Sequence, residues 1–209
     1  MSESGTRHPE RWKRASEIVG VFLLSVVAVL TAWCGFQASK WGGEMSIAFS
    51  QASSARIQAA NAEGEARSAR TFDLTIYSAY VQAVGSGDDE LAEYIRDRFT
   101  PEFDVAFEAW VADGMVEAGP FGREEYVPAG TVEAEELTAR ADAKFAEALE
   151  NNQRGDNYSL LTVLFALVLF LTAMSQRDIA PWVGRVLLGL ALVITGVGAV
   201  IMATFPIRI

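Results

Sequence analysis

The sequence predicts an all-α protein in which three transmembrane helices carry a long antiparallel helical stalk and a small helical head. Three observations predict this fold class. Long uncharged apolar runs occur three times within 209 residues. Alanines after the first run recur at helical spacing. Short amphipathic segments, separated by glycine-containing turns, lie between the two arms of the predicted stalk.

The three apolar runs are residues 18–36, 158–174 and 186–205, and none contains Asp, Glu, Lys, Arg or His. A helix needs roughly 20 apolar residues to cross about 30 Å of hydrocarbon, so each run is a predicted span. Three buried helices of a soluble protein are the alternative, but only the middle segment would be left to cover them. A cleaved secretion signal is a second alternative for the first run. Its length, and Trp33 directly before Cys34, favour an uncleaved anchor.

Charge is concentrated in residues 37–157, which carry 23 acidic and 10 basic side chains and therefore a net charge near −13. Neutralising phosphates requires clustered Lys and Arg, which is the opposite charge pattern. The composition of this segment therefore excludes nucleic acid and anionic lipid as its partners.

The basic residues beside the spans predict the orientation. More of them lie in the N-terminal tail (1–17) and the short loop (175–185) than beside the span ends on the other side of the membrane. We therefore expect the tail and this loop in the cytoplasm of a cell with a plasma or inner membrane. Residues 37–157 and the C-terminal tail 206–209 are expected outside. The residues counted are Arg11, Lys13, Arg14, Arg177 and Arg185 against Lys40, Arg154 and Arg208.

A stripe of alanines follows the first span with an alternating spacing of three and four residues, which is the spacing of a coiled-coil seam. Small side chains at a seam let two helix axes approach to about 8 Å or less. The alternative is that these alanines merely fill a solvated helix. The predicted helix-packing seam comprises Ala52, Ala55, Ala59, Ala62, Ala66 and Ala69.

Asp73 occupies the next position of this stripe, where a small residue is expected. It either sets the register of the seam or marks a point where the seam drifts onto Phe72 and Ile76, and the drift is the favoured interpretation.

The second arm of the stalk is predicted over residues 131–157, with Thr131 as its N-cap. The chain runs away from the first span and back toward the second, so the two arms are antiparallel. The expected apolar face comprises Ala134, Leu137, Ala141, Phe145 and Ala148.

The predicted head contains two short helices between the arms. The turn at 85–90 precedes the first helix, and Thr100 with Pro101 predicts the start of the second. Residues 114–130 are expected to form a loop, with Phe72, Tyr77 and Tyr80 packing beneath the head. The expected buried faces are Leu91, Tyr94, Ile95 and Phe99 for the first helix, and Phe103, Phe107, Trp110 and Val111 for the second.

Residues that carry common enzyme chemistry are scarce. The single histidine is His8 in the tail and the single cysteine is Cys34, so neither a catalytic triad nor a Cys/His metal cluster is available. The expectation is no enzyme activity, no cofactor and no metal. The acidic stretch 88–97 could hold a cation weakly, but a solvated helix start is favoured. Cys34 could pair with another chain, although a buried thiol is favoured.

The third span carries small residues that favour close packing of spans. Thr195, Ala199 and Ala203 form one row, and Gly189 with Gly196 forms a second small surface. The sequence leaves open whether these rows pack within the chain or between copies.

The segment "ERWKRASEIVGVFLLSVVAVLTAWCGFQASKWGGE", followed by an Ala-, Ser- and Gln-rich helix and two closing spans, resembles a group of uncharacterised prokaryotic membrane proteins. The resemblance implies a three-span membrane protein and no catalytic activity.

These observations predict a non-enzymatic integral membrane protein that acts as a self-associating scaffold, sensor or accessory subunit. The expected partners are the lipid bilayer, further copies of the chain and a protein at the head. An oligomeric channel or transporter is the alternative, with hydroxyl residues such as Thr162, Thr172 and Thr195 lining its pore.

Overall fold

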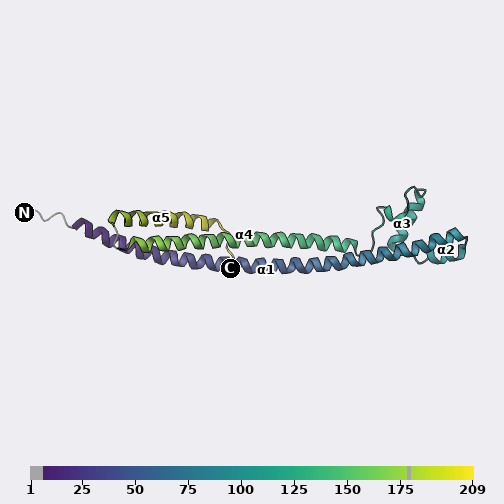
Figure 1. Cartoon of the computed structure of the whole chain (residues 1–209), viewed down its shortest axis with the longest axis horizontal. Helices are drawn as coiled ribbons and strands as arrows, with labels where there is room; N and C mark the ends of the chain where they lie inside the picture. Colours follow the sequence, from purple (N-terminus) through teal and green to yellow (C-terminus); the bar gives the residue numbers. More distant parts are fainter. Residues whose placement is uncertain (1–6, 178–179) are drawn as a thin grey trace, which may run out of the picture. The chain divides into compact units, whose positions relative to one another are not determined.

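The computed structural model describes residues 7–177 and 180–209, and over these residues the chain forms five α-helices, one 3₁₀ helix and no strand. The predicted all-α fold class is therefore confirmed (Figure 1). Residues 1–6 of the predicted tail and residues 178–179 of the predicted loop lie outside the described residues. The elements are α1 (Arg7–Ser86), α2 (Asp89–Arg96), α3 (Pro101–Ala112), the 3₁₀ helix η1 (Pro120–Gly122), α4 (Thr131–Ser175) and α5 (Pro181–Thr204).

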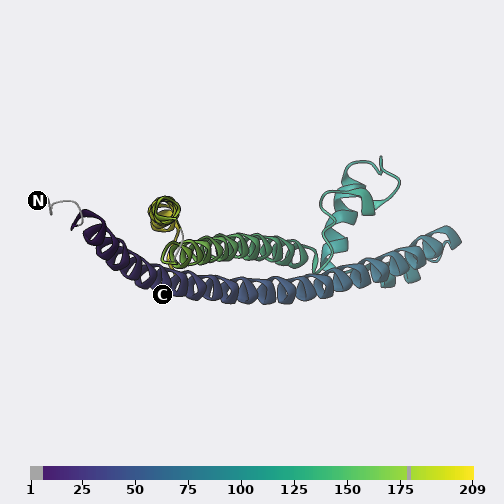
Figure 2. The same cartoon turned by 60° about the vertical axis from the view of Figure 1, so that its left-hand side comes forward.

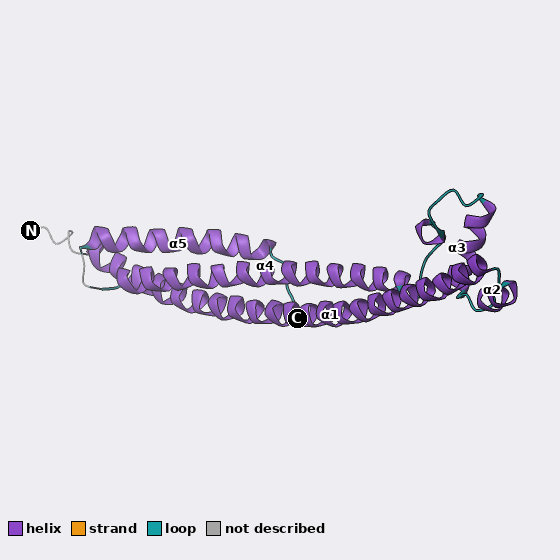
Figure 3. Ribbon diagram, turned by 45° about the vertical axis from the view of Figure 1, so that its right-hand side comes forward, coloured by secondary structure: helices purple, strands orange, loops and turns teal. Residues whose placement is uncertain are grey.

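The chain divides into two compact units, and α1 and α4 each contribute residues to both. The first unit comprises residues 1–48 and 146–209, and we call it the span unit. The second comprises residues 49–145, and we call it the head unit. Helices account for most of both units, and the longest loop of the head unit lies between α3 and α4 (Figure 3).

Three helices, α1, α4 and α5, are long and apolar enough to cross a membrane. Each contains one of the apolar runs found in the sequence. The third apolar run begins at residue 186, and the helix that contains most of it, α5, begins at Pro181. Proline suits the first turn of a helix because its missing N–H has no partner there in any case.

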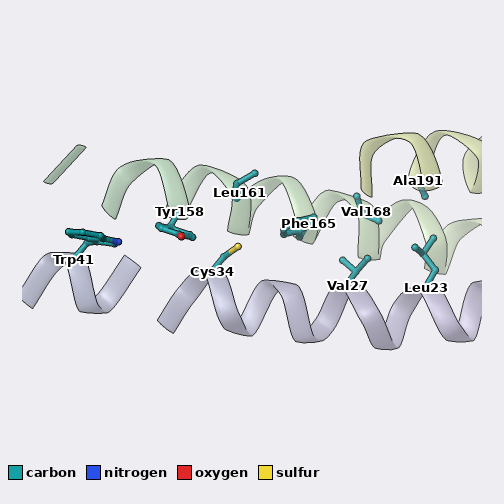
Figure 4. Close-up of a cluster of buried hydrophobic side chains, with 9 residues drawn as sticks. All are labelled: Leu23, Val27, Cys34, Trp41, Tyr158, Leu161, Phe165, Val168 and Ala191. Carbon is teal, nitrogen blue, oxygen red and sulfur yellow. The ribbon is translucent and has the colours of Figure 1, made fainter. Parts of the chain in front are cut away.

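The core of the span unit lies between α1 and α4, whose large side chains face one another (Figure 4). Ala191 reaches this core from α5. Cys34 is free and fully buried, and its Sγ lies 3.8 Å from Sδ of Met202. The residues of this core are Leu23, Val27, Cys34 and Trp41 of α1, Tyr158, Leu161, Phe165 and Val168 of α4, and Ala191.

The tail that follows α5 is attached to both other helices of the span unit. The buried side-chain amide of Gln37 accepts from the backbone N–H of Arg208 and donates to its carbonyl, both at 3.0 Å. The Tyr158 hydroxyl donates to the carbonyl of Pro206 at 3.1 Å. Arg208 also pairs with Glu44 at 3.0 Å. These contacts hold the end of α5 against α1 and α4.

The head unit begins where α1 continues past residue 48, and α2 then runs back alongside the end of α1 (Figures 1 and 2). Side-chain caps start both short helices: Asp88 accepts from the N–H of Leu91, and Thr100 accepts from the N–H of Phe103. The predicted start at Thr100 and Pro101 agrees with this geometry. A side-chain cap accepts a hydrogen bond from an N–H group that has no partner within the helix.

Several local predictions for the head unit differ from the structure. Val111 was expected on the buried face of the second short helix but is exposed, and Phe72 was expected to pack beneath the head but is also exposed. Leu91 and Tyr94 were expected on the buried face of the first short helix, but both are exposed and Ala92 is buried instead. A small residue lies at the contact because α2 packs directly along α1. Thr131 was expected to cap α4, whereas it is the first residue of that helix. The difference is one position, which is the usual uncertainty of a helix boundary.

Candidate functional site

The predicted alanine seam lies on one face of α1 in the head unit. Ala52, Ala55, Ala59 and Ala62 are buried, whereas the neighbouring Ala60 is exposed. The α4 segment that faces them buries alanines of its own, Ala134 and Ala141. At the flank of this helix pair, Arg56 forms an ion pair with Asp142 at 3.2 Å, and Phe49 contacts Phe145 edge to face.

The seam changes character at its last two positions, Ala66 and Ala69, which are only half-buried. Here α4 has its first residue, Thr131, and the chain enters the helix through Gly130 (φ +89°). A Cβ at position 130 would lie 2.6 Å from the carbonyl oxygen of Ala62 and 3.2 Å from the nitrogen of Ala66. Glycine is therefore required twice, by the left-handed backbone and by the close approach to α1.

Asp73 continues the stripe and is buried, with 1% of its surface exposed. Its carboxylate accepts hydrogen bonds from the hydroxyls of Thr100 at 2.7 Å and Tyr126 at 2.8 Å. The favoured interpretation was a drift of the seam onto Phe72 and Ile76. It is wrong at Phe72, which is 53% exposed, while Ile76 is half-buried. A small residue would leave both hydroxyls without this acceptor, so the stripe carries a carboxylate at this position.

Beyond Asp73, aromatic side chains replace the alanines. Phe103 packs against Phe121, with ring centroids 4.8 Å apart, and against Tyr77 edge to face. This aromatic cluster joins α1, the segment between α2 and α3, α3 itself and the loop that follows it into one core. It comprises Phe103, Phe107 and Tyr126 with Ala106 at its centre, surrounded by Tyr77, Tyr80, Phe99, Trp110 and Phe121.

Arg96 of α2 connects this helix to α3 beside the aromatic cluster. Arg96 forms ion pairs with Asp104 and Glu108 and lies over the ring of Phe107. Such a cation–π contact adds to the ion pairs.

Arg123 binds three carboxylates of the loop and the end of α3. Its partners are Asp113 at 2.8 Å, and Glu117 and Glu125 at 3.2 Å. Hydrogen bonds to these carboxylates, from Glu125 first, raise the pKa of Arg123. A backbone hydrogen bond and the Arg123 contact lower the pKa of Glu125. The loop 114–130 is therefore ordered around one cation.

An open cleft of about 890 Å³ lies beside the seam in the head unit. One wall is the flank of α1 with Arg67 and Arg70, the other is the first three turns of α4, and Tyr126 and Pro128 line it as well. The Arg70 guanidinium lies 6.0 Å from the centre of the Tyr126 ring. Ala66 and Ala134 contribute apolar surface to the lining.

Tyr126 therefore takes part in both the aromatic cluster and the cleft. Burial raises the pKa of its hydroxyl, and the hydrogen bond to Asp73 raises it further. The hydroxyl consequently stays protonated at neutral pH and keeps donating to the Asp73 carboxylate. Tyr126 lies 53 residues from Asp73 in the sequence, so helical spacing could not reveal the pair.

The predicted span-packing residues Thr195, Ala199 and Ala203 lie on α5, where Thr195 and Ala199 are half-buried and Ala203 is exposed. Gly198 of α5 also approaches α4 closely. A Cβ there would lie 2.9 Å from the ring of Phe165. Ala191, seven residues earlier, is fully buried. Ala191 and Gly198 are small residues seven positions apart, a spacing that favours close helix packing. The row at 195–203 was predicted in their place because it also consists of small residues.

The acidic stretch 88–97 has a structural role at its first residue, because Asp88 caps α2. In the part of the chain that the structure describes, no group of three or more His, Cys, Asp or Glu side chains is placed to hold a metal ion. Asp89 and Glu90 lie in the first turn of α2, where the helix dipole stabilises negative charge.

These features define an all-α protein with three candidate membrane spans and an ordered helical head unit. No protein-family model matches the chain, and neither the curated proteins nor the solved structures contain a match.

Proposed function

We propose that the chain is a non-enzymatic integral membrane protein that self-associates through its spans and presents the head unit outside the cell membrane as a scaffold, sensor or accessory subunit. The observation that carries self-association is the outer face of α5. Gly189, Gly196 and Ala203 are exposed there at intervals of seven residues.

The same face has room for another helix. Among the described residues, nothing lies within 4 Å of a Cβ built at Gly189 or Gly196. Exposed small residues in a membrane helix let a second helix approach closely, and spans associate largely through such packing. A second copy of this chain is the partner that supplies a matching face.

Size measurement in lipid nanodiscs tests this proposal. Gly196→Leu should reduce the oligomer to a smaller species, because the added side chain separates the two helices. Gly35→Leu provides the matched control, since Gly35 is also exposed on a candidate span and also has open space around it. A monomeric native chain, or equal effects of the two variants, would refute self-association through α5.

The proposed orientation rests on the basic residues beside the spans, with the N-terminus in the cytoplasm. Reporter fusions at Gly87 and at the C-terminus should then both report an extracytoplasmic location. A cytoplasmic signal at Gly87 would reverse the orientation.

The alternative, a channel lined by hydroxyl residues, has less support. The hydroxyls of Thr162, Thr172 and Thr195 all donate to backbone carbonyls of their own helices, at 2.7–3.0 Å. Thr172 is also fully buried beside the α1–α4 core. Such internal hydrogen bonds satisfy the polar groups without a water-filled path.

A further inference from the structure

The cleft in the head unit is lined by two arginines and three carboxylates. Arg67 and Arg70 project from α1 near Tyr126, where the seam alanines become half-exposed. Glu63 and Glu135 also line the cleft, Glu63 at 4.0 Å from Arg67, and Asp142 pairs with Arg56. Two arginines of the cleft therefore lie near Tyr126 within a segment that carries a strong negative charge.

Arg70 is available to bind an anion. Among the described residues it forms no ion pair with a carboxylate, and its guanidinium lies near the ring of Tyr126. Arg67 is only weakly engaged, since its pair with Glu63 spans 4.0 Å and its side chain is 78% exposed. A guanidinium that is not engaged in an ion pair can donate two hydrogen bonds to a carboxylate.

The Tyr126 ring near Arg70 is held in place by contacts within the protein. The Tyr126 hydroxyl donates to the buried carboxylate of Asp73, which Thr100 also binds. Gly130 packs against the backbone of α1 and sets where α4 begins. A rigid support of this kind lowers the cost of ordering the site on binding.

The rest of the lining limits the chemistry of the ligand. Alanines and Pro128 offer apolar surface, while Thr131 and Thr138 add hydroxyl groups. Glu63, Glu135 and Asp142 would repel a ligand with several negative charges. A volume of about 890 Å³ is within the usual range for sites that hold small organic molecules, about 300–1,000 Å³.

We propose that this cleft binds a small organic monocarboxylate, with its carboxylate between Arg70 and Arg67 and its apolar body along the alanines of α1 and α4. The site assigns a ligand class to the head unit and goes beyond the self-association proposed for the spans. Neither proposal depends on the other, because this one involves residues of the head unit alone.

Isothermal titration calorimetry of the full-length protein in neutral-lipid nanodiscs tests the proposal. The probe is N-acetyl-L-phenylalanine, which joins one carboxylate to an apolar body. Its uncharged amide and inorganic phosphate are the comparison probes. Empty nanodiscs supply the blank. We expect a dissociation constant of about 1 mM or tighter for the acid, and weaker binding of both comparison probes.

The decisive variant is Arg70→Gln, which should weaken binding of the acid by about tenfold or more. Arg140→Gln is the matched control, since Arg140 is exposed on α4 but does not line the cleft. Hydrogen exchange of residues 100–131 should be the same in both variants, which separates loss of the ligand contact from unfolding of the head.

Three results would overturn the proposal. The native protein could show no saturable binding of the acid. The amide or phosphate could bind as tightly as the acid. The two arginine variants could weaken binding equally. Selective binding of the acid that depends on Arg70 supports it.

Discussion

The alanine seam and the aromatic cluster belong to the same head unit but are built from side chains of opposite size. A buried phenylalanine removes 150–250 Å² from water, whereas an alanine removes far less, at roughly 25 cal/mol for each Å² of apolar area. The aromatic cluster therefore supplies most of the burial that stabilises the head unit, and the seam determines how closely α1 and α4 approach.

The two regions also differ in how far apart their contacting residues lie in the sequence. Seam residues recur every three or four positions along one helix, while the aromatic cluster joins residues from Tyr77 to Tyr126. Asp73 lies at the boundary and belongs to both, as the last residue of the stripe and the acceptor for Thr100 and Tyr126. The seam is therefore defined by regular spacing along one helix, whereas the aromatic cluster is defined by how the loop folds back onto the helices.

The largest expected effect comes from the cluster. Phe103 is fully buried and contacts five other aromatic rings. Phe103→Ala should destabilise the head unit by about 3–5 kcal/mol through lost burial and the cavity left behind. Amide hydrogen exchange of the full-length protein should show faster exchange in residues 77–126, with the span unit unchanged. Unaltered exchange would remove the cluster as the main source of stability.

The boundary residue should come next. Asp73→Ala leaves the Thr100 and Tyr126 hydroxyls without their shared acceptor and should cost about 2–4 kcal/mol, because hydrogen bonds to a charged group are worth about 1.5–3 kcal/mol each. Hydrogen exchange near Thr100 and Tyr126 measures the loss. Thr75→Ala is a control, since its hydroxyl bonds within its own helix on the surface. Equal effects would mean that Asp73 does not join the seam to the cluster.

The helices could be predicted because their signals are local. Uncharged runs, the Thr100 and Pro101 start, and the alanine spacing each require only neighbouring residues. The buried role of Asp73 was missed because its partners lie 27 and 53 residues away. The three-four spacing itself was the available signal, since it placed position 73 on the buried face.

The cleft could not be predicted for the same reason. It exists because α4 begins at Thr131, which leaves the last seam alanines partly uncovered, and because the loop brings Tyr126 beside Arg70. No spacing along the chain relates these residues. Gly198 on α5 was missed for a different reason, since several small residues on one helix offered competing rows.

Gly130 and Gly64 extend the comparison, because replacing each of them by alanine should change the stability of the head unit in opposite directions. Gly130→Ala places a methyl group in a left-handed backbone and 2.6 Å from the Ala62 carbonyl, which should cost about 2–3 kcal/mol. Gly64→Ala lies within α1 in open space and should stabilise the helix by about 1 kcal/mol. Hydrogen exchange in residues 58–70 reports both. No destabilisation by Gly130→Ala would contradict the close approach at Gly130, and destabilisation by Gly64→Ala would contradict the open space around Gly64.

The most direct test of the close-packed seam compares Ala59→Leu with Ala60→Leu, measured by hydrogen exchange of residues 49–70 and 131–145 in the full-length protein. Both changes add the same volume with nearly the same helix propensity, but Ala59 is buried and Ala60 is exposed. The seam predicts faster exchange on both helices for Ala59→Leu, equivalent to about 1–3 kcal/mol from overpacking, and little change for Ala60→Leu. Equal exchange in the two variants would show that the alanines are solvated filler and that α1 and α4 do not meet along this seam.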